Sequence, residues 1–136
     1  MIIKGRSIAA GRATGELVVT DAPLSFLSGV DPETGMVIDT DHPLNGIKIS
    51  GKVLAFPHGK GSTVGSYVMY ALSRNGVAPA AIINAEAEAI IAVGAIIAKI
   101  PMIDRLEGGL SSLKSGVVVT VDGDAGELEI DDQAEL

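Results

Sequence analysis

Cysteine is absent from this chain of 136 residues, and aromatic residues make up only 3% of it. The absence of cysteine excludes disulfides, zinc–thiolate sites and cysteine-ligated iron–sulfur clusters within this chain. With so few aromatic side chains, the core must consist of isoleucine, valine, leucine and alanine. The 17 glycines favour tight α/β or β packing over a bundle of long helices. We expect a single domain spanning residues 1–136.

Positive charge is also scarce, because 10 Lys and Arg residues stand against 17 Asp and Glu residues, which gives a formal net charge of −7. This charge argues against binding to nucleic acids or anionic membranes, which depends on basic patches. A small anionic ligand remains compatible with it, since local donors can outweigh the global sign. Long apolar runs are missing as well, because Pro79, Asn84, Glu86 and Glu88 interrupt the apolar stretch 77–98. We expect a soluble, cytoplasmic protein.

The order of apolar and turn-forming residues predicts a mixed β/α domain of packed sheet layers with a few helices. Strands are expected at residues 2–8, 16–20, 36–39, 47–56, 80–84 and 101–104, and a hairpin at 116–130. Turns are expected at residues 11–15, 31–35 and 42–46. Helical spacing after residue 63 predicts a helix with Ser62 or Thr63 as its N-cap and Asn75 with Gly76 as its C-cap. A second helix is expected within 87–98, where residues 95–97 fit a helix or a strand.

The stretch 56–67 (Phe-Pro-His-Gly-Lys-Gly-Ser-Thr-Val-Gly-Ser-Tyr) is a glycine-rich turn from a predicted strand into a predicted helix. It brings the hydroxyl of Ser62, the cation of Lys60 and free backbone N–H groups to one helix N-terminus, where negative charge is stabilised. Its glycine spacing fits neither a Walker A loop nor a dinucleotide fingerprint. The alternative is a plain strand-to-helix connection capped by Ser62. His58 and Lys60 in the same short loop favour the functional interpretation.

No catalytic triad or metal site is evident in the sequence. The only histidines are His42 and His58, and neither comes with an acidic residue that would orient it toward a serine. Used as a base, Ser62 needs its pKa lowered by several units, through donors and positive charge in a dry site.

The remaining charged residues receive structural interpretations. Scattered cations such as Arg6 and Arg12 are interpreted as surface charges. Asp104, at a predicted strand end, is interpreted as a turn residue. Glu86 and Glu88 are interpreted as carboxylates favoured by a helix N-terminus.

Several segments then follow one another in an order that identifies a family. They are 4–6 (Lys-Gly-Arg), 23–26 (Pro-Leu-Ser-Phe), 29–35 (Gly-Val-Asp-Pro-x-Thr-Gly), 42–46 (His-Pro-Leu-x-Gly), 56–66 in the glycine-rich loop, 78–83 (Ala-Pro-Ala-Ala-Ile-Ile), 94–98 (Gly-Ala-Ile-Ile-Ala) and 100–104 (Ile-Pro-Met-Ile-Asp). Together they resemble the swivelling domain of the aconitase X family over nearly the full chain. The resemblance implies an α/β fold of the swivelling β/β/α type, with mixed sheet layers and a few flanking helices.

The resemblance also implies an activity. The chain would be the small subunit of a two-subunit hydro-lyase that removes water from (R)-5-phosphomevalonate to give trans-anhydromevalonate 5-phosphate, in an archaeal-type mevalonate pathway. A cysteine-containing large subunit would hold a 4Fe–4S cluster, and this chain would bind no cofactor or metal. The serine that matches Ser62 is the proton acceptor in this family. From their position beside it, Lys60, Gly61 and Thr63 are interpreted as substrate-binding residues.

Three alternatives remain open at the level of sequence. One is a related aconitase X hydro-lyase for another small hydroxy acid, such as a hydroxyproline. Another is a swivelling phosphohistidine carrier, which needs a histidine at the helix start, whereas His58 precedes the glycine-rich loop's serine. The third is a noncatalytic binding subunit, for which Ser62→Ala would leave the complex fully active.

Overall fold

The computed structural model describes residues 1–60 and 64–130. Its strands are β1 (Ile2–Lys4), β2 (Arg6–Ala9), β3 (Arg12–Val19), β4 (Val53–Phe56), β5 (Ala81–Asn84), β6 (Met102–Asp104), β7 (Val118–Asp122) and β8 (Glu127–Ile130). Its helices are α1 (Phe26–Gly29), α2 (Gly65–Arg74) and α3 (Ala89–Ala98), and a 3₁₀ turn, η1, covers Leu110–Ser112.

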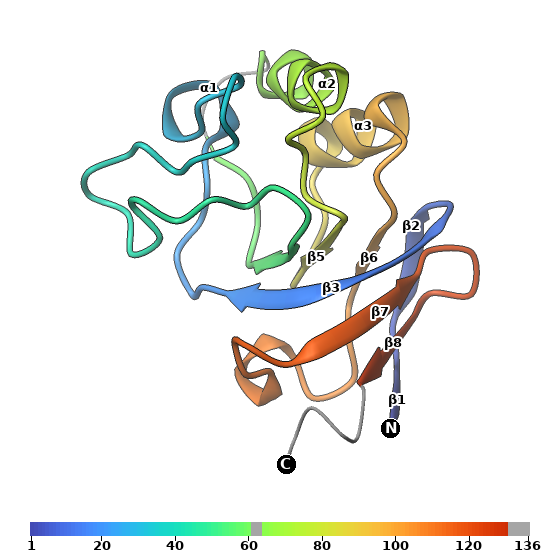
Figure 1. Ribbon diagram of the computed structural model, residues 1–136. Helices are drawn as coiled ribbons and strands as arrows, with labels where there is room; N and C mark the ends of the chain where they lie inside the picture. Colours follow the sequence, from blue (N-terminus) through green and yellow to red (C-terminus); the bar gives the residue numbers. More distant parts are fainter. Residues whose placement is uncertain (61–63, 131–136) are drawn as a thin grey trace.

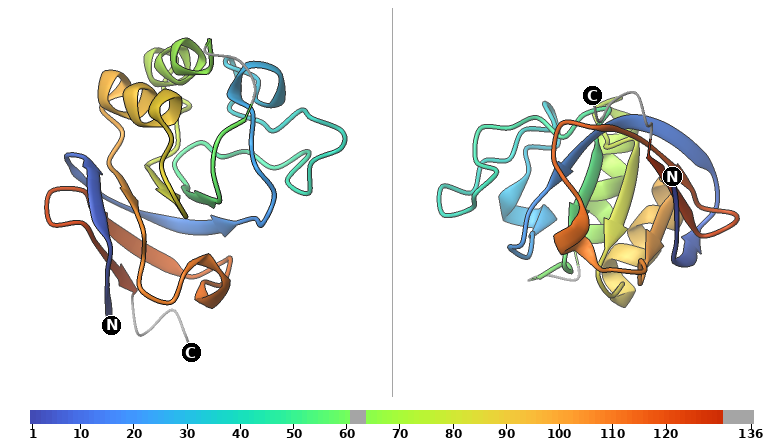
Figure 2. Two further views of the ribbon diagram at one scale, coloured as in Figure 1. Left: turned by 180° about the vertical axis from the view of Figure 1, so that it is seen from behind. Right: turned by 90° about the horizontal axis from the view of Figure 1, so that it is seen from below.

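The strands hydrogen-bond in the order β1-β8-β7-β3-β4-β5-β6-β2. Strands β3 to β6 are parallel to one another, whereas β7, β8 and β1 continue from β3 in antiparallel pairs. The long strand β3 joins the two parts, because residues 12–16 pair with β7 and residues 17–19 pair with β4. Figure 1 shows the three helices on one side of the parallel strands and β7 and β8 on the other, and Figure 2 shows the same layers from behind.

The parallel strands are buried on both faces, and this explains why they read as continuous apolar runs. Every residue of β4 and β5 is buried. Along β4, Leu54 and Phe56 belong to a core shared with apolar residues of α2 and α3. Val53 and Ala55 point to the opposite face and belong to a second core shared with β7 and β8. Two sheet layers and a helix layer around two cores confirm the expected β/β/α fold.

The two longer helices differ in how they begin. Val64 precedes α2 and gives it no side-chain cap, and the residues predicted as N-cap, Ser62 and Thr63, lie outside the described ones. The predicted C-cap at Asn75 is confirmed. Helix α3 continues through 95–97, which the sequence left open between helix and strand. None of the helices in residues 1–60 and 64–130 is long and apolar enough to cross a membrane.

Strand β3 starts earlier than predicted. The turn expected at 11–15 is confined to Gly11, whose φ is +119°, and residues 12–15 extend the strand in register with β7. The strand predicted at 36–39 is also wrong, because Met36 and Val37 make only isolated bridges. Of the strand predicted at 47–56, only β4 forms. Gly51, with a φ of +70°, turns the chain immediately before it.

Candidate active site at the carboxyl ends of the parallel strands

Three chain segments lie side by side where the parallel strands end. Strand β4 leads into residues 57–60, β5 into 85–88, and β6 into Arg105. The amide of Ala85 donates to the carbonyl of Pro57 (2.9 Å), and the amide of Arg105 donates to the carbonyl of Ala85 (3.1 Å). In open α/β sheets, ligands bind beyond the carboxyl ends of the strands, so this edge is the candidate active site.

Residues 58–60, which open the glycine-rich loop, are fixed by backbone hydrogen bonds to Leu24. The Leu24 amide donates to the carbonyl of His58 (3.3 Å), and the Lys60 amide donates to the carbonyl of Leu24 (3.2 Å). Gly59 between them is buried against α3, and a Cβ atom there would lie 2.5 Å from Ile91 Cγ1. Only glycine therefore fits this close approach of loop and helix.

The N-terminus of α3 meets the same loop through Glu88. The Glu88 carboxylate accepts hydrogen bonds from the amides of Ile91 (2.9 Å) and Ile90 (3.3 Å) and so caps the helix. Its Oε1 atom would lie 3.0 Å from a Cβ atom on Gly59. The interpretation of Glu88 as a carboxylate at a helix N-terminus is confirmed.

A cavity of about 240 Å³ opens between residues 59–60 of the loop and the beginnings of α1, α2 and α3. It is lined by Phe26, Gly59, Lys60, Gly65, Glu88, Ile90 and Ile91. Of the predicted site residues, Lys60 is exposed and lines this cavity together with Gly65, the first residue of α2. The other predicted site residues, Ser62, Gly61 and Thr63, lie outside the described residues. An ammonium group beside a helix N-terminus can stabilise a bound anion.

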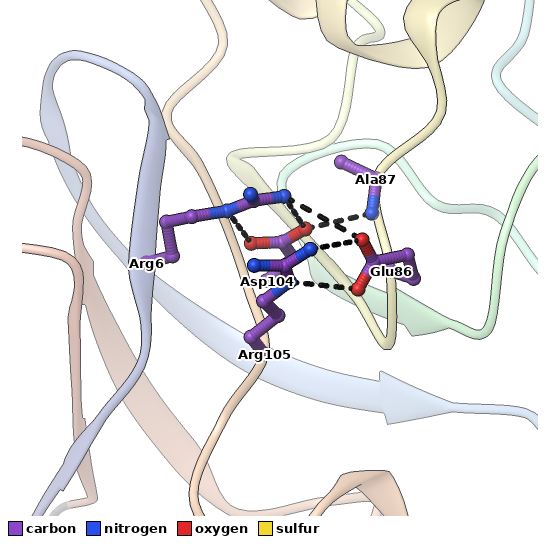
Figure 3. A network of polar contacts seen from close by, with 5 residues as sticks. All are labelled: Arg6, Glu86, Ala87, Asp104 and Arg105. Atoms are coloured by element: carbon purple, nitrogen blue, oxygen red, sulfur yellow. Dashed lines mark hydrogen bonds and ion pairs between the residues drawn. The ribbon is translucent and has the colours of Figure 1, made fainter.

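A buried carboxylate at the end of β6 ties three elements together (Figure 3). Asp104 is fully buried and accepts hydrogen bonds from Arg6 Nε (2.9 Å), Arg6 Nη2 (2.7 Å) and the amide of Ala87 (2.7 Å). Sequence reasoning missed this contact, because it interpreted Asp104 as a turn residue and Arg6 as a surface cation. The interpretation of Asp104 is wrong; Arg6 is exposed as a surface cation is, but it also pairs with the buried Asp104. Strands β2 and β6 align Arg6 with Asp104 across 98 residues of chain, a separation that no local pattern reports.

A second ion pair lies on the solvent side of the first. Arg105 donates to Glu86 through Nε (2.8 Å) and Nη2 (2.6 Å), and Arg6 Nη2 lies 3.9 Å from Glu86 Oε1. The hydrogen bond from Arg105 lowers the pKa of Glu86 from its ordinary value of 4.5, and Glu86 raises the pKa of Arg105. Glu86 therefore pairs with a cation instead of a helix N-terminus. The positive charges of the two guanidinium groups are balanced by the two carboxylates. This cluster therefore holds chain segments together and has no net positive charge to attract an anion.

The histidines and possible metal ligands lie elsewhere or are already engaged. His58 is exposed, and its Nδ1 donates to the carbonyl of Gly59 (2.8 Å). His42 is buried; its Nε2 donates to the carbonyl of Pro23 and its Nδ1 accepts from the amide of Leu44. The described residues contain no group of three or more His, Asp or Glu side chains that could hold a metal ion.

Known proteins resemble this chain over nearly its full length. Residues 2–130 match the family model of the aconitase X swivel domain. A chain from Pyrococcus furiosus named phosphomevalonate dehydratase small subunit is 59% identical over 136 residues, which is 100% of both chains. A Methanosarcina acetivorans chain of the same name is 57% identical over 129 residues, which is 94% of this chain and 90% of that one. The crystal structure of Thermococcus kodakaraensis aconitase X in its holo form matches with a TM-score of 0.93 and 56% identity, covering 97% of this chain and 99% of the other.

Proposed function

This chain belongs to the aconitase X swivel-domain family, and on that basis we propose that it is the small subunit of a phosphomevalonate dehydratase. The reaction removes water from (R)-5-phosphomevalonate and gives trans-anhydromevalonate 5-phosphate, as a hydro-lyase step of an archaeal-type mevalonate pathway. The observation that carries the proposal is the 59% identity to a relative of that name over the full length of both chains. The family match over residues 2–130 supports one swivelling domain.

A large subunit completes the proposed enzyme, as the name "small subunit" of the relatives indicates. The residues of this chain do not fit a 4Fe–4S cluster, because the sequence contains no cysteine. We therefore assign the cluster implied by the family resemblance to cysteines of the large subunit. There it would supply Lewis-acid chemistry for the substrate hydroxyl.

Within this chain we assign the role of proton acceptor to Ser62, in the loop that follows β4. Elimination of water requires removal of a weakly acidic proton next to the substrate carboxylate, and the negative charge that develops must be stabilised. Lys60, Gly61 and Thr63 are the proposed substrate contacts. The exposed side chain of Lys60, which borders the cavity at the beginning of α2, supports this assignment. Closure of this edge over the partner's site would exclude water.

The test combines this chain with its large subunit. The two are co-purified, the cluster is reconstituted anaerobically, and turnover of (R)-5-phosphomevalonate is measured. We expect no dehydration by this chain alone and activity from the complex. Ser62→Ala should lower kcat by about a hundredfold or more, because the base is lost, while the complex still assembles.

Two results would contradict the proposal. One is dehydration by the isolated chain. The other is a Ser62→Ala complex that turns over at the rate of the unmodified enzyme, which would make this chain a noncatalytic binding subunit.

A further inference from the structure

Glu88 occupies a position that the capping role alone does not explain. Helix N-caps are usually Ser, Thr, Asp or Asn, whose short side chains reach the first free amides. The longer Glu88 side chain reaches the amides of Ile90 and Ile91 and also extends over Gly59. The same Oε1 atom that accepts from Ile91 packs against Gly59, and Ile91 packs against Gly59 as well.

We propose that Glu88 is a positioning residue for the catalytic loop, acting through Gly59, and that Asp104 holds Glu88 in place. The proposal rests on the proposed function, in which the loop after β4 carries the proton acceptor. It adds a role for two acidic residues, Glu88 and Asp104, to which the proposed function assigns none.

The contacts form a continuous path from the sheet to the loop. Asp104 is anchored by Arg6 and accepts from the amide of Ala87, the residue immediately before Glu88. Three N–H groups donate to the Asp104 carboxylate, so this position requires a side chain that only accepts hydrogen bonds. The backbone of Ala87 is thus fixed to the end of β6, and this also fixes the backbone position of Glu88, the next residue.

The opposite side of the loop is fixed independently. Leu24 holds residues 58–60 by two backbone hydrogen bonds. Gly59 therefore lies between Leu24 on one side and the Glu88 carboxylate with Ile91 on the other. Loss of the Glu88 side chain frees the α3 amides and removes part of the surface on which Gly59 is seated. A displacement of about 1 Å in a catalytic group costs roughly a hundredfold in rate.

The experiment compares Glu88→Ala with Glu88→Gln in the reconstituted complex. For Glu88→Ala we expect kcat to fall by roughly tenfold to a hundredfold, because the alignment of the base is lost. Glu88→Gln retains an amide oxygen that can accept the shorter bond from Ile91 (2.9 Å) and gives up only the longer bond from Ile90 (3.3 Å), so its kcat should stay within about threefold of the unmodified enzyme.

Asp122→Ala is the matched control. The Asp122 carboxylate also accepts two backbone amides, from Asp124 and Ala125 (3.0 Å each), but in the turn between β7 and β8. This variant should lose a similar amount of thermal stability and keep its kcat. Equal loss of kcat in Glu88→Ala and Asp122→Ala would overturn the proposal, because general destabilisation would then explain both. Equal loss in Glu88→Gln and Glu88→Ala would also overturn it, because the charge of Glu88 would then matter instead of its contacts.

A second measurement separates this proposal from the proposed function. Hydrogen exchange of the Lys60 amide, which donates to Leu24, is measured in the isolated full chain. We expect exchange at least about tenfold faster in Glu88→Ala, unchanged in Glu88→Gln, and unchanged in Asp122→Ala. Unchanged exchange in Glu88→Ala would overturn the positioning role even in an active complex. An inactive unmodified complex with faster exchange in Glu88→Ala would contradict only the phosphomevalonate dehydratase activity.

Discussion

At the scale of single residues, Asp104 shows how a buried charge can be tolerated. A buried charge is costly when it has no partner. The Asp104 carboxylate accepts two hydrogen bonds from the Arg6 guanidinium and one from the backbone amide of Ala87. Arg6 remains partly exposed, so the cation keeps its contact with water. The pair therefore fixes the end of β6 without burying two charges.

Asp104→Asn should test this arrangement. The amide NH₂ would face a donor whichever way the side chain turns, so we expect a loss of about 1–3 kcal/mol in the free energy of unfolding. Urea unfolding followed by circular dichroism measures it. Asp41→Asn, at an exposed position, is the control and should stay within about 0.5 kcal/mol of the unmodified chain. Equal stability of the two variants would contradict the acceptor-only site.

Gly59→Ala is the second residue-scale prediction. The added Cβ atom would lie 2.5 Å from Cγ1 and 2.8 Å from Cδ1 of Ile91, so we expect a loss of about 1–3 kcal/mol in unfolding free energy. Ile91→Ala removes both of those atoms. In the double variant the losses should be less than additive, which a double-mutant cycle by urea unfolding detects. Strict additivity would mean that the two residues do not compete for this space.

The sequence located the proposed catalytic loop but not the residues that support its described part. Glycine, lysine and serine next to a helix are local signals, so the loop 56–67 could be predicted. The Arg6–Asp104 pair joins residues far apart in the chain, and only the register of β2 with β6 brings them together. The contact of Glu88 with Gly59 depends in the same way on how α3 packs against the end of β4.

At the scale of elements, α3 shows why glycine inside a helix can be favourable. Gly94 packs directly against α2, where an added Cβ atom would lie 3.2 Å from Ser66 Cα and would clash with the Met69 side chain. The structure has Gly94 in mid-helix, where helix contact outweighs propensity.

Gly94→Ala should therefore destabilise the domain even though alanine is the better helix former. The gain in propensity is about 1 kcal/mol, whereas overpacking between two helices costs about 1–3 kcal/mol. We expect a net loss of about 1 kcal/mol or more, measured as a shift of the thermal midpoint. A stabilised Gly94→Ala variant would show that α2 and α3 separate easily.

Strand β3 was predicted too short for a related reason. Glycines at 11 and 15 flank polar residues, and this pattern is typical of a turn. Pairing with β7 overrides it, because residues 12–16 form a half-exposed strand whose backbone donors and acceptors are satisfied by the second sheet.

At the scale of the whole molecule, the pH dependence of stability should carry a contribution from Glu86. Its pKa in the folded chain lies below 4.5, so the pair with Arg105 stabilises the domain above that value and is lost as pH falls through the folded-state pKa. Glu86→Gln should thus unfold at lower urea than the unmodified chain near about pH 7, and the two should converge as pH falls through the folded-state pKa of Glu86. High salt should shrink the difference, because the pair is exposed. A difference that is independent of pH would contradict this account.

Residues 2–9 form β1 and β2, and these strands lie at opposite ends of the strand order. Their partners, β8 and β6, lie much later in the chain, so β1 and β2 are synthesised well before the strands that they pair with. Pairing strands that lie far apart in the chain costs loop-closure entropy before their contacts can stabilise the fold. Such pairing slows folding to times of about milliseconds to seconds. A nascent chain that ends before residue 127 offers β1 no β8 to pair with, and leaves an unpaired edge open to aggregation.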